Sequence, residues 1–194
     1  MRYVAQTDYP DIPYPTRTDT PEDEFGHRST VKTSACGLCS GIMMVDRLLT
    51  DYKFDIQDAV DLSLASGANH GPGTDMLIYS KALCEKFNLK SYMSNDINDV
   101  IHCLKTGGCV IGNVWNTEQH KAIFTKAAHY ICIVSYSADG RLVVLDPSGK
   151  KPGKFDEAIA NGLVQKEGNI CYVTPDVLDQ EGMVPHKYYL FWRA

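Results

Sequence analysis

Apolar and polar residues alternate with two different periods along this chain, and the period changes near its middle. In the first half, apolar residues recur every three or four positions, which is typical of helices that bury one side. After Cys36 this spacing is followed by Ile42, Val45, Leu48 and Leu49. The same spacing predicts a second helix from Ile56 to Ala65. We therefore expect residues 36–106 to form a helical half.

Two more helices are predicted there by residues that commonly begin or end a helix. In "GTDMLIYSKALCEKF", Thr74 is a typical N-terminal cap, and an apolar stripe runs from Leu77 to Phe87. In "NDINDVIHCLKTGG", Asn95 or Asp96 caps the start, and two glycines follow the end.

In the second half, short β-branched or aromatic runs are bounded by turn residues, which is typical of strands. These runs are "CVIGNVW", "HYICIVSYS", "RLVVLDP", "NICYVT" and "KYYLFW". The tetrapeptide "SADG" between the second and third runs predicts a hairpin turn. Helices followed by an antiparallel sheet predict an α+β fold, in one domain of residues 1–194 whose sheet half is 107–194.

The first 35 residues have a different character. Residues 7–35 are rich in Pro, Asp, Thr and Tyr, and this punctuation argues against a helix. We therefore expect residues 1–35 to form an extended, looping arm. The acidic run from Asp19 to Glu24 lacks the ligand spacing of a calcium loop, so we interpret it as a solvated loop.

Charge and composition indicate which kinds of partner this chain can bind and in which compartment it is expected. The net charge of −5 and the pI near 5.6 argue against a nucleic-acid surface, because phosphate binding needs clustered Lys and Arg. No apolar run approaches the ~20 residues of a membrane span, and "MRYVAQTDYPDIPYP" does not resemble a signal peptide. Seven cysteines are an odd number. We expect reduced thiols and a cytoplasmic protein, or a secreted one if a leader has been removed.

The stretch "TSACGLCSGIMMV" places Cys36 and Cys39 three residues apart, which raises several chemical possibilities. A thioredoxin-like redox pair follows a buried strand, but the residues before Cys36 are polar. A structural zinc site needs four ligands in close pairs, and the remaining five cysteines are scattered. The sequence therefore argues against a redox pair and against a zinc site, but both remain alternatives.

The remaining chemical possibility is that Cys36 is a nucleophile. Gly37 and the Ser40-Gly41 pair permit a tight turn into the helix that follows. A cysteine on the first turn of a helix lies near unpaired N–H groups and the positive end of the helix dipole, and both favour the thiolate. The competing interpretation is that Cys36 and Cys39 are small buried residues.

A nucleophilic thiolate needs a histidine and a group that orients it, and one predicted hairpin supplies both. His129 opens one strand and Asp146 closes the next. A turn at residues 138–140 places the two positions opposite each other to within two residues. Asp146 then accepts a hydrogen bond from one ring nitrogen and leaves the other for the thiolate. Alone, Asp146 also fits an ordinary turn, and His129 an ordinary strand end.

One further histidine lies in a loop suited to a substrate cleft. His70 belongs to the glycine-rich segment "SGANHGPG". Because such a loop bends easily, His70, Gly71 and Gly73 are candidate substrate-binding residues. The competing interpretation is a surface loop.

Four blocks of the chain together resemble papain-like cysteine peptidases, nearest the branch of the bacteriocin-leader (double-glycine) peptidases and their stand-alone bacterial relatives. The blocks are "ACGLCSGIMMV", "GTDMLIYSKALCEKFNL", "DVIHCLKTGGCVIGNV" and "AAHYICIVSYSADGRLVVLDPSG". In the family, the first block holds the nucleophile at a helix start, and the last carries the catalytic His and Asp on a hairpin. The blocks follow the family's order.

The resemblance implies a papain-like fold, with a helical half packed on an antiparallel sheet and the active cleft between them. It assigns Cys36 as the nucleophile, His129 as the general acid and base, and Asp146 as the orienting acid. It also implies an upstream Gln whose side-chain amide helps to form the oxyanion hole. Gln6 is the glutamine that precedes Cys36.

The chain departs from the family pattern at three places. The segment from Gln6 to Cys36 is longer than is usual, so residues 10–30 must loop out and return. Leu38-Cys39 stands where Pro-Thr or Pro-Ala is common, and Ala128 stands where Gly often precedes the His. We expect Cys39 to point into the core, because a disulfide between two cysteines at one helix start is strained.

The expected function is therefore a cysteine peptidase, or a related thiol amidohydrolase, that cleaves peptide or amide bonds through a thioester. No metal or organic cofactor is implied, and the expected partner is a peptide or protein substrate. Two alternatives keep the fold: an acyltransferase, and a non-catalytic binding domain. A Cys-x-x-Cys redox protein is a more distant one. Subsite preference and oligomeric state do not follow from the sequence.

Overall fold

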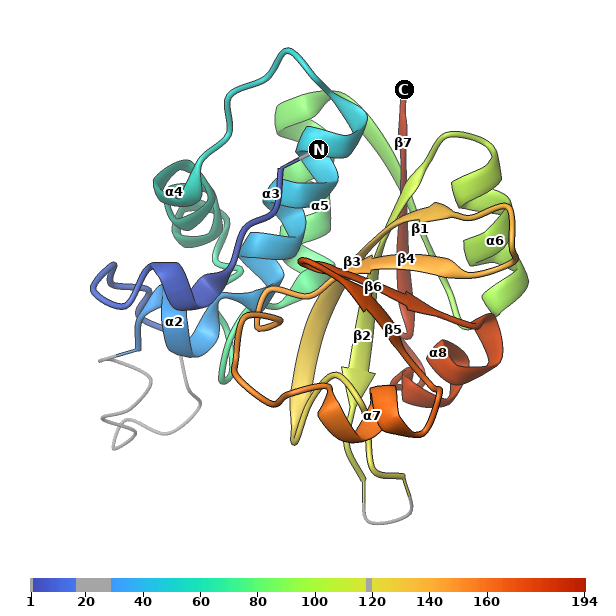
Figure 1. The fold of residues 1–194 in the computed structure, drawn as a ribbon. Coiled ribbons are helices and arrows are strands. Elements are labelled where there is room, and N and C mark those ends of the chain that lie inside the picture. The colour runs from blue at the N-terminus through green and yellow to red at the C-terminus, as the bar shows by residue number, and fades with distance from the viewer. Residues whose placement is uncertain (1, 17–28, 118–119) are drawn as a thin grey trace.

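A computed structural model describes residues 2–16, 29–117 and 120–194. Within these residues the chain forms one antiparallel sheet flanked by helices, so the fold is α+β (Figure 1). The helices are η1 (Gln6–Asp8), α2 (Val31–Ser34), α3 (Cys36–Leu48), α4 (Ile56–Ser66), α5 (Met76–Phe87), α6 (Ile97–Lys105), α7 (Asp156–Ala160) and α8 (Pro175–Glu181).

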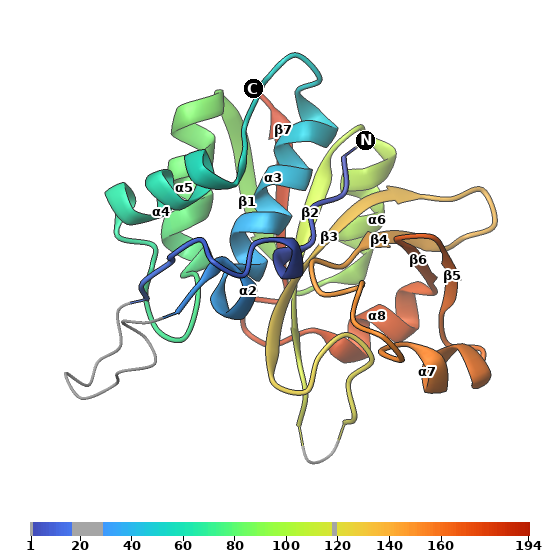
Figure 2. The same ribbon diagram turned by 60° about the vertical axis from the view of Figure 1, so that its left-hand side comes forward.

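The sheet has seven described strands in the order β1-β7-β2-β3-β4-β6-β5. Their bounds are β1 (Leu89–Ser94), β2 (Cys109–Trp115), β3 (Ala128–Tyr136), β4 (Leu142–Leu145), β5 (Gln165–Glu167), β6 (Ile170–Val173) and β7 (Tyr188–Arg193). All neighbours are antiparallel. Figure 2 shows β7 between β1 and β2, so strands from both ends of the sheet half meet there.

Helices cover both faces of this sheet, which explains why its central strands are apolar on both sides. Helices α3, α4 and α5 lie on one face, and α6 and α8 lie on the other (Figure 1). Along β2, Ile111 packs with the α3 side and Val110 packs with the α6 side. Successive strand residues point to opposite faces, so a strand covered twice needs an unbroken apolar run.

The pattern-based prediction of the helices is confirmed for four elements. Helix α3 begins at Cys36, α4 at Ile56, and α6 ends before Gly107. Asp96 caps α6, as expected. Helix α5 is capped by Asp75, whose side chain accepts from two backbone N–H groups, and not by Thr74. Asp accepts more strongly than a hydroxyl at this position because it is charged.

Three elements differ from the predicted division of the chain. Strand β1 lies inside the region 36–106 that was expected to be helical, and helices α7 and α8 lie inside the predicted sheet half. The five predicted strands are all present.

The N-terminal arm is more structured than expected. Gln6–Asp8 form a turn of 3-10 helix, and α2 is a short helix where none was predicted. Thr30 and Thr33 form a capping box at the start of α2. This capping box stabilises the first turn of the helix, although the composition of the segment argued against a helix. The acidic run from Asp19 to Glu24 lies outside the described residues.

The two described parts of the arm lie side by side. Backbone N–H groups of Tyr14 and Val31 donate to the carbonyls of Ser29 and Ile12 at 2.9 Å each, and Pro13 bridges Thr30. Residues 12–14 and 29–31 therefore lie side by side, as the long segment between Gln6 and Cys36 required. No helix among the described residues is long and apolar enough to cross a membrane.

Candidate active site

Cys36 is the first residue of α3, where backbone N–H groups have no partners within the helix. The residue before it, Ala35, offers no side-chain cap, so these N–H groups remain available to a negative charge. The side chain of Cys36 is partly exposed, whereas Cys39 is fully buried. The prediction that Cys39 points into the core is confirmed.

The glycines near Cys36 serve a purpose other than the predicted turn. Gly37 and Gly41 lie within α3. A Cβ on Gly37 would come within 2.8 Å of the Thr74 side chain, and one on Gly41 within 2.9 Å of Tyr79. They therefore permit the close approach of α3 to Thr74, just before α5, and to Tyr79 within α5.

His129 and Asp146 meet at the open end of the β3–β4 hairpin. Nε2 of His129 lies 2.7 Å from Oδ1 of Asp146, and both side chains are buried. Strand pairing joins Cys132 to Leu145, and an irregularity at residues 133–135 shifts the register. Asp146 therefore falls two positions from strict opposition to His129, at the limit of the predicted range.

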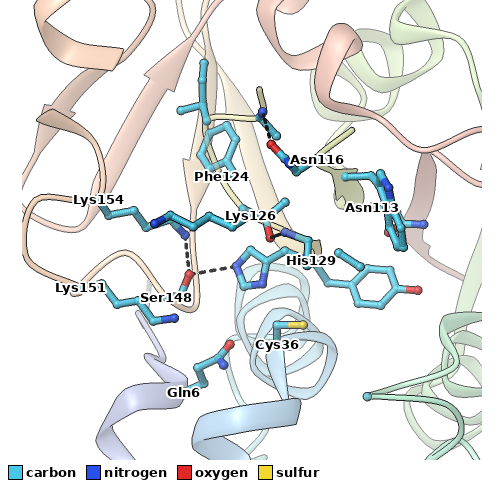
Figure 3. Close-up of a pocket in the computed structure, with 18 of the residues that line it drawn as sticks. Gln6, Cys36, Asn113, Asn116, Phe124, Lys126, His129, Ser148, Lys151 and Lys154 are labelled. Atoms are coloured by element: carbon cyan, nitrogen blue, oxygen red, sulfur yellow. Dashed lines mark hydrogen bonds between the residues drawn. The ribbon is translucent and has the colours of Figure 1, made fainter. Parts of the chain in front are cut away.

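The second nitrogen of His129 is left for Cys36. Figure 3 shows the His129 ring above the cysteine side chain, and each of the two groups shifts the pKa of the other toward its charged form. Because Nε2 is engaged by Asp146, the ring presents Nδ1 to the sulfur. The structure thus brings Cys36, His129 and Asp146 together from the helical layer and the sheet.

Cys36, His129 and Asp146 each shift the pKa of a neighbour toward its charged form. Burial opposes ionisation of Cys36, but the charge and hydrogen bond of His129 outweigh it, so the thiol's pKa is lowered. Burial likewise disfavours the imidazolium, yet Asp146 and Cys36 raise the pKa of His129 to about 9. Burial of Asp146 is outweighed by His129, so the pKa of this carboxyl lies well below its usual value. The site therefore favours a thiolate–imidazolium pair.

Two residues that the sequence analysis did not single out complete the surroundings of Asp146. The Ser148 backbone N–H donates to Asp146 Oδ1 at 2.7 Å, and its hydroxyl lies 3.3 Å from His129 Nε2. The Lys154 ammonium donates to both Asp146 Oδ2 and the Ser148 hydroxyl. The carboxylate is thus held on both oxygens, which fixes the plane of the His129 ring.

Gln6 lies on the same pocket as Cys36 and His129. Its side-chain Nε2 donates to the Lys32 carbonyl at 2.7 Å, and its backbone N–H donates to the Pro147 carbonyl at 2.9 Å. The first bond orients the side-chain amide and uses one of the two N–H groups of Nε2, and the second bond holds the backbone of Gln6. The side-chain Oε1 is buried and has no hydrogen-bond partner among the described residues.

The pocket that Cys36 and His129 line is large. Its volume is about 1170 Å³, and His70 and Gly73 form part of its wall. Gly71 belongs to the same loop, with a φ of 62°, but does not line the pocket. The loop that precedes β3 forms another wall, which includes Phe124 and Lys126 (Figure 3).

The alternative chemistries find less support in this geometry. All seven cysteines are free thiols, and burial raises the pKa of Cys39. A buried thiol of high pKa is a poor attacking group in thiol–disulfide exchange. In the part of the chain that the structure describes, no group of three or more His, Cys, Asp or Glu side chains could hold a metal ion.

Comparison with known proteins adds no assignment. No model of a protein family matches the chain, and no curated protein matches it either.

Proposed function

We propose that this chain is a cysteine peptidase or a related thiol amidohydrolase with a papain-like fold. The observation that carries the proposal is the buried His129 ring, which hydrogen-bonds Asp146 through one nitrogen and lies above the Cys36 side chain (Figure 3). A free thiol at a helix start, an imidazole and an orienting carboxylate are the three parts that acyl transfer to sulfur requires.

In the proposed reaction, the Cys36 thiolate attacks the carbonyl carbon of an amide and a C–S bond forms. The His129 imidazolium gives its proton to the leaving nitrogen as the C–N bond breaks. Neutral His129 then removes a proton from water, and the resulting hydroxide attacks the thioester. The acid is released and Cys36 is regenerated, with its proton balance restored.

The oxyanion of each tetrahedral intermediate needs hydrogen-bond donors that are in place beforehand. The Cys36 backbone N–H and the second N–H of Gln6 Nε2 are the proposed donors. Each such donor contributes on the order of 3 kcal/mol to transition-state stabilisation. The bond from Gln6 to the Lys32 carbonyl supports this role, because it prevents the amide from rotating.

Labelling of the thiol tests the nucleophile without a known substrate. We expect iodoacetamide at pH 6.5 to modify Cys36 at least tenfold faster than a denatured control, because the thiolate is favoured. The Cys36→Ala variant should lose this fast phase. Cys84→Ala is the matched control, since Cys84 is a half-exposed thiol on α5 outside the pocket. Equal rates in the folded and denatured protein would contradict the proposal.

Hydrolysis is tested with a mixture of unstructured peptides, analysed by mass spectrometry for new termini. Cleavage should depend on Cys36 and His129 and should release free carboxylic acids. Adding a primary amine at high concentration distinguishes acyl transfer, which would give amide products in place of acids. If Cys36 reacts quickly but no peptide is cleaved or coupled, a non-catalytic binding domain becomes the better interpretation.

A further inference from the structure

The pocket is positively charged although the chain as a whole carries a net charge of −5. Its described lining contains the lysines 121, 126, 151 and 154 and one carboxylate, Glu157. A cleft lined by one sign of charge concentrates ligands of the opposite sign. The pocket therefore differs in charge from the rest of the surface.

Two of these lysines are already neutralised by carboxylates. Lys121 lies 2.6 Å from Glu157, and Lys154 is bonded to Asp146. Lys126 and Lys151 have no carboxylate partner among the described residues, and both are exposed. The two side chains thus supply positive charge that no described carboxylate offsets.

These two lysines lie on one side of the candidate site. Figure 3 shows Lys126 and Lys151 on the side of the His129 ring where Ser148 lies, whereas Cys36 lies below the ring. Burial lowers the pKa of Lys154, and the neighbouring charge of Lys151 adds to this effect while Asp146 opposes it. The charge of Lys151 therefore acts on Lys154, which bonds Asp146 in the candidate site.

The direction of proton transfer relates this side to the substrate. The group that protonates a leaving amine must lie within hydrogen-bond reach of that nitrogen. In the proposed reaction this group is His129, so the leaving half of the substrate occupies the His129 side of the sulfur. That half then lies beside Lys126 and Lys151.

We propose that the substrate carries a carboxylate on its leaving amine, and that Lys126 and Lys151 bind it. This inference rests on the proposed function, because it assigns the substrate class of the same site. Two kinds of peptide have this chemistry: one whose leaving amino acid has a free α-carboxylate, and one whose leaving residue is Asp or Glu. Both place a negative charge within a few bonds of the scissile nitrogen.

The charge is tested first without any substrate, by comparing two alkylating agents of similar size. Iodoacetate is an anion and iodoacetamide is neutral, so their rate ratio at Cys36 reports the local potential. We expect Lys126→Gln and Lys151→Gln each to lower this ratio roughly two- to threefold, the size of a unit-charge effect within one Debye length in water. The iodoacetamide rate alone should stay within twofold.

A matched control separates local charge from net charge. Lys81→Gln removes the same charge from an exposed position on α5, outside the pocket lining. Its rate ratio should equal that of the unaltered chain, and 0.5 M salt should reduce the difference between the variants. An unchanged ratio in the Lys126→Gln/Lys151→Gln double variant would overturn the inference. A slow iodoacetamide reaction in every variant would instead count against the proposed nucleophile.

Peptide cleavage then distinguishes the two sources of the carboxylate. Peptides with the same acyl half are paired so that the leaving residue is Glu or Gln, and so that its C-terminus is free or amidated. We expect kcat/KM to be roughly five- to tenfold higher for the preferred charged member, the size of two exposed ion pairs. This preference should disappear in the double variant. Equal cleavage of all four peptides would contradict the substrate class while leaving the proposed hydrolase intact.

Discussion

At the scale of single residues, the proposed chemistry depends on opposite charges that stabilise each other in a buried site. His129 lowers the pKa of Cys36, Asp146 and Cys36 raise the pKa of His129, and His129 lowers the pKa of Asp146. Each group alone would be driven to its neutral form by burial. A change at one of the three therefore alters the titration of the other two.

The first prediction concerns the pH dependence of Cys36. The alkylation rate should persist below the usual range of a thiol, and His129→Ala should move its midpoint to higher pH, because burial then acts unopposed. The rate of hydrolysis should also depend on pH at the alkaline end. It should fall as pH rises through about 9, where His129 loses the proton that the leaving amine needs. A midpoint that is the same in His129→Ala would contradict the pairing.

Lys154 leads to the second prediction, because it shares the charge of Asp146 with His129. In Lys154→Met, Asp146 is neutralised by the imidazolium alone, which is then held more strongly. The alkaline limb of kcat/KM should move to higher pH by about half a unit to one unit. Lys154→Arg should restore the original limb, since it keeps the charge. A loss of activity without a shift of the limb would mean that Lys154 only supports the fold.

The sequence indicated part of this site and missed the rest for a physical reason. Cys36, His129 and Asp146 each stand at the start or end of a predicted element, so pattern and register indicated where they meet. Lys154 stands in a loop, and no period fixes the direction of a loop side chain. Ser148, two residues after Asp146, fits the Asx-type hydrogen bonding of "DPS", which was a usable signal.

At the scale of elements, the wall of the pocket that precedes β3 is held by one buried carboxylate. Glu181, the last residue of α8, accepts from the backbone N–H groups of Ile123 and Phe124 and lies 2.8 Å from Nε2 of His120. Its exposed fraction is 1%. A loop that would otherwise carry unpaired N–H groups is thus fixed to the helix behind it.

The third prediction follows from this attachment. Glu181→Ala leaves the N–H groups of Ile123 and Phe124 without their acceptor, so their amide hydrogens should exchange faster with solvent. The free energy of unfolding should fall by about 2–3 kcal/mol, the cost of orphaned buried donors. Glu157→Ala, which removes only an exposed ion pair to Lys121, should change it by less than about 1 kcal/mol. Equal effects of the two substitutions would contradict this account.

The elements that the sequence predicted have apolar residues at a regular spacing, and the elements that it missed lack such a spacing. Strand β1 has one buried residue in six, because it lies at the edge of the sheet and its outer positions face solvent. Helix α7 has no buried residue, so nothing in its sequence imposes a spacing of three or four. Tertiary contacts alone determine such elements.

At the scale of the whole molecule, the N-terminal segment joins the two layers that carry the site. It runs along α3, where the backbone N–H of Arg2 donates to Asp46, and it reaches the loop after β4 (Figure 1). There the Tyr3 hydroxyl donates to the Asp146 carbonyl at 2.6 Å. The helical and sheet halves are thus joined by a backbone N–H and a side-chain hydroxyl of a third segment, close to His129 and Asp146.

The fourth prediction concerns the stability of the whole chain. The raised pKa of His129 contributes stability that is complete below about 6.5 and is lost as pH rises through about 9. The lowered pKa of Cys36 has the opposite sign, so its contribution grows over the same range and offsets the loss. The unaltered chain should therefore show a nearly flat unfolding free energy from pH 7 to 8.5.

Cys36→Ala removes the offset and should reveal the loss. Its free energy of unfolding should fall by on the order of 1–2 kcal/mol across that range, as measured by denaturant titration with a reductant present. Cys84→Ala should behave like the unaltered chain. A flat profile in Cys36→Ala would show that Asp146 without Cys36 does not hold His129 in its charged form.

The position of β7 sets the order in which a newly made chain can mature. Residues 188–193 insert between two strands made about 100 and about 80 residues earlier, at Leu89–Ser94 and Cys109–Trp115. During translation, β1 and β2 wait with open hydrogen-bonding edges until these residues leave the ribosomal tunnel. The sheet that carries His129 therefore has its full strand order only after residues 188–193 have been made.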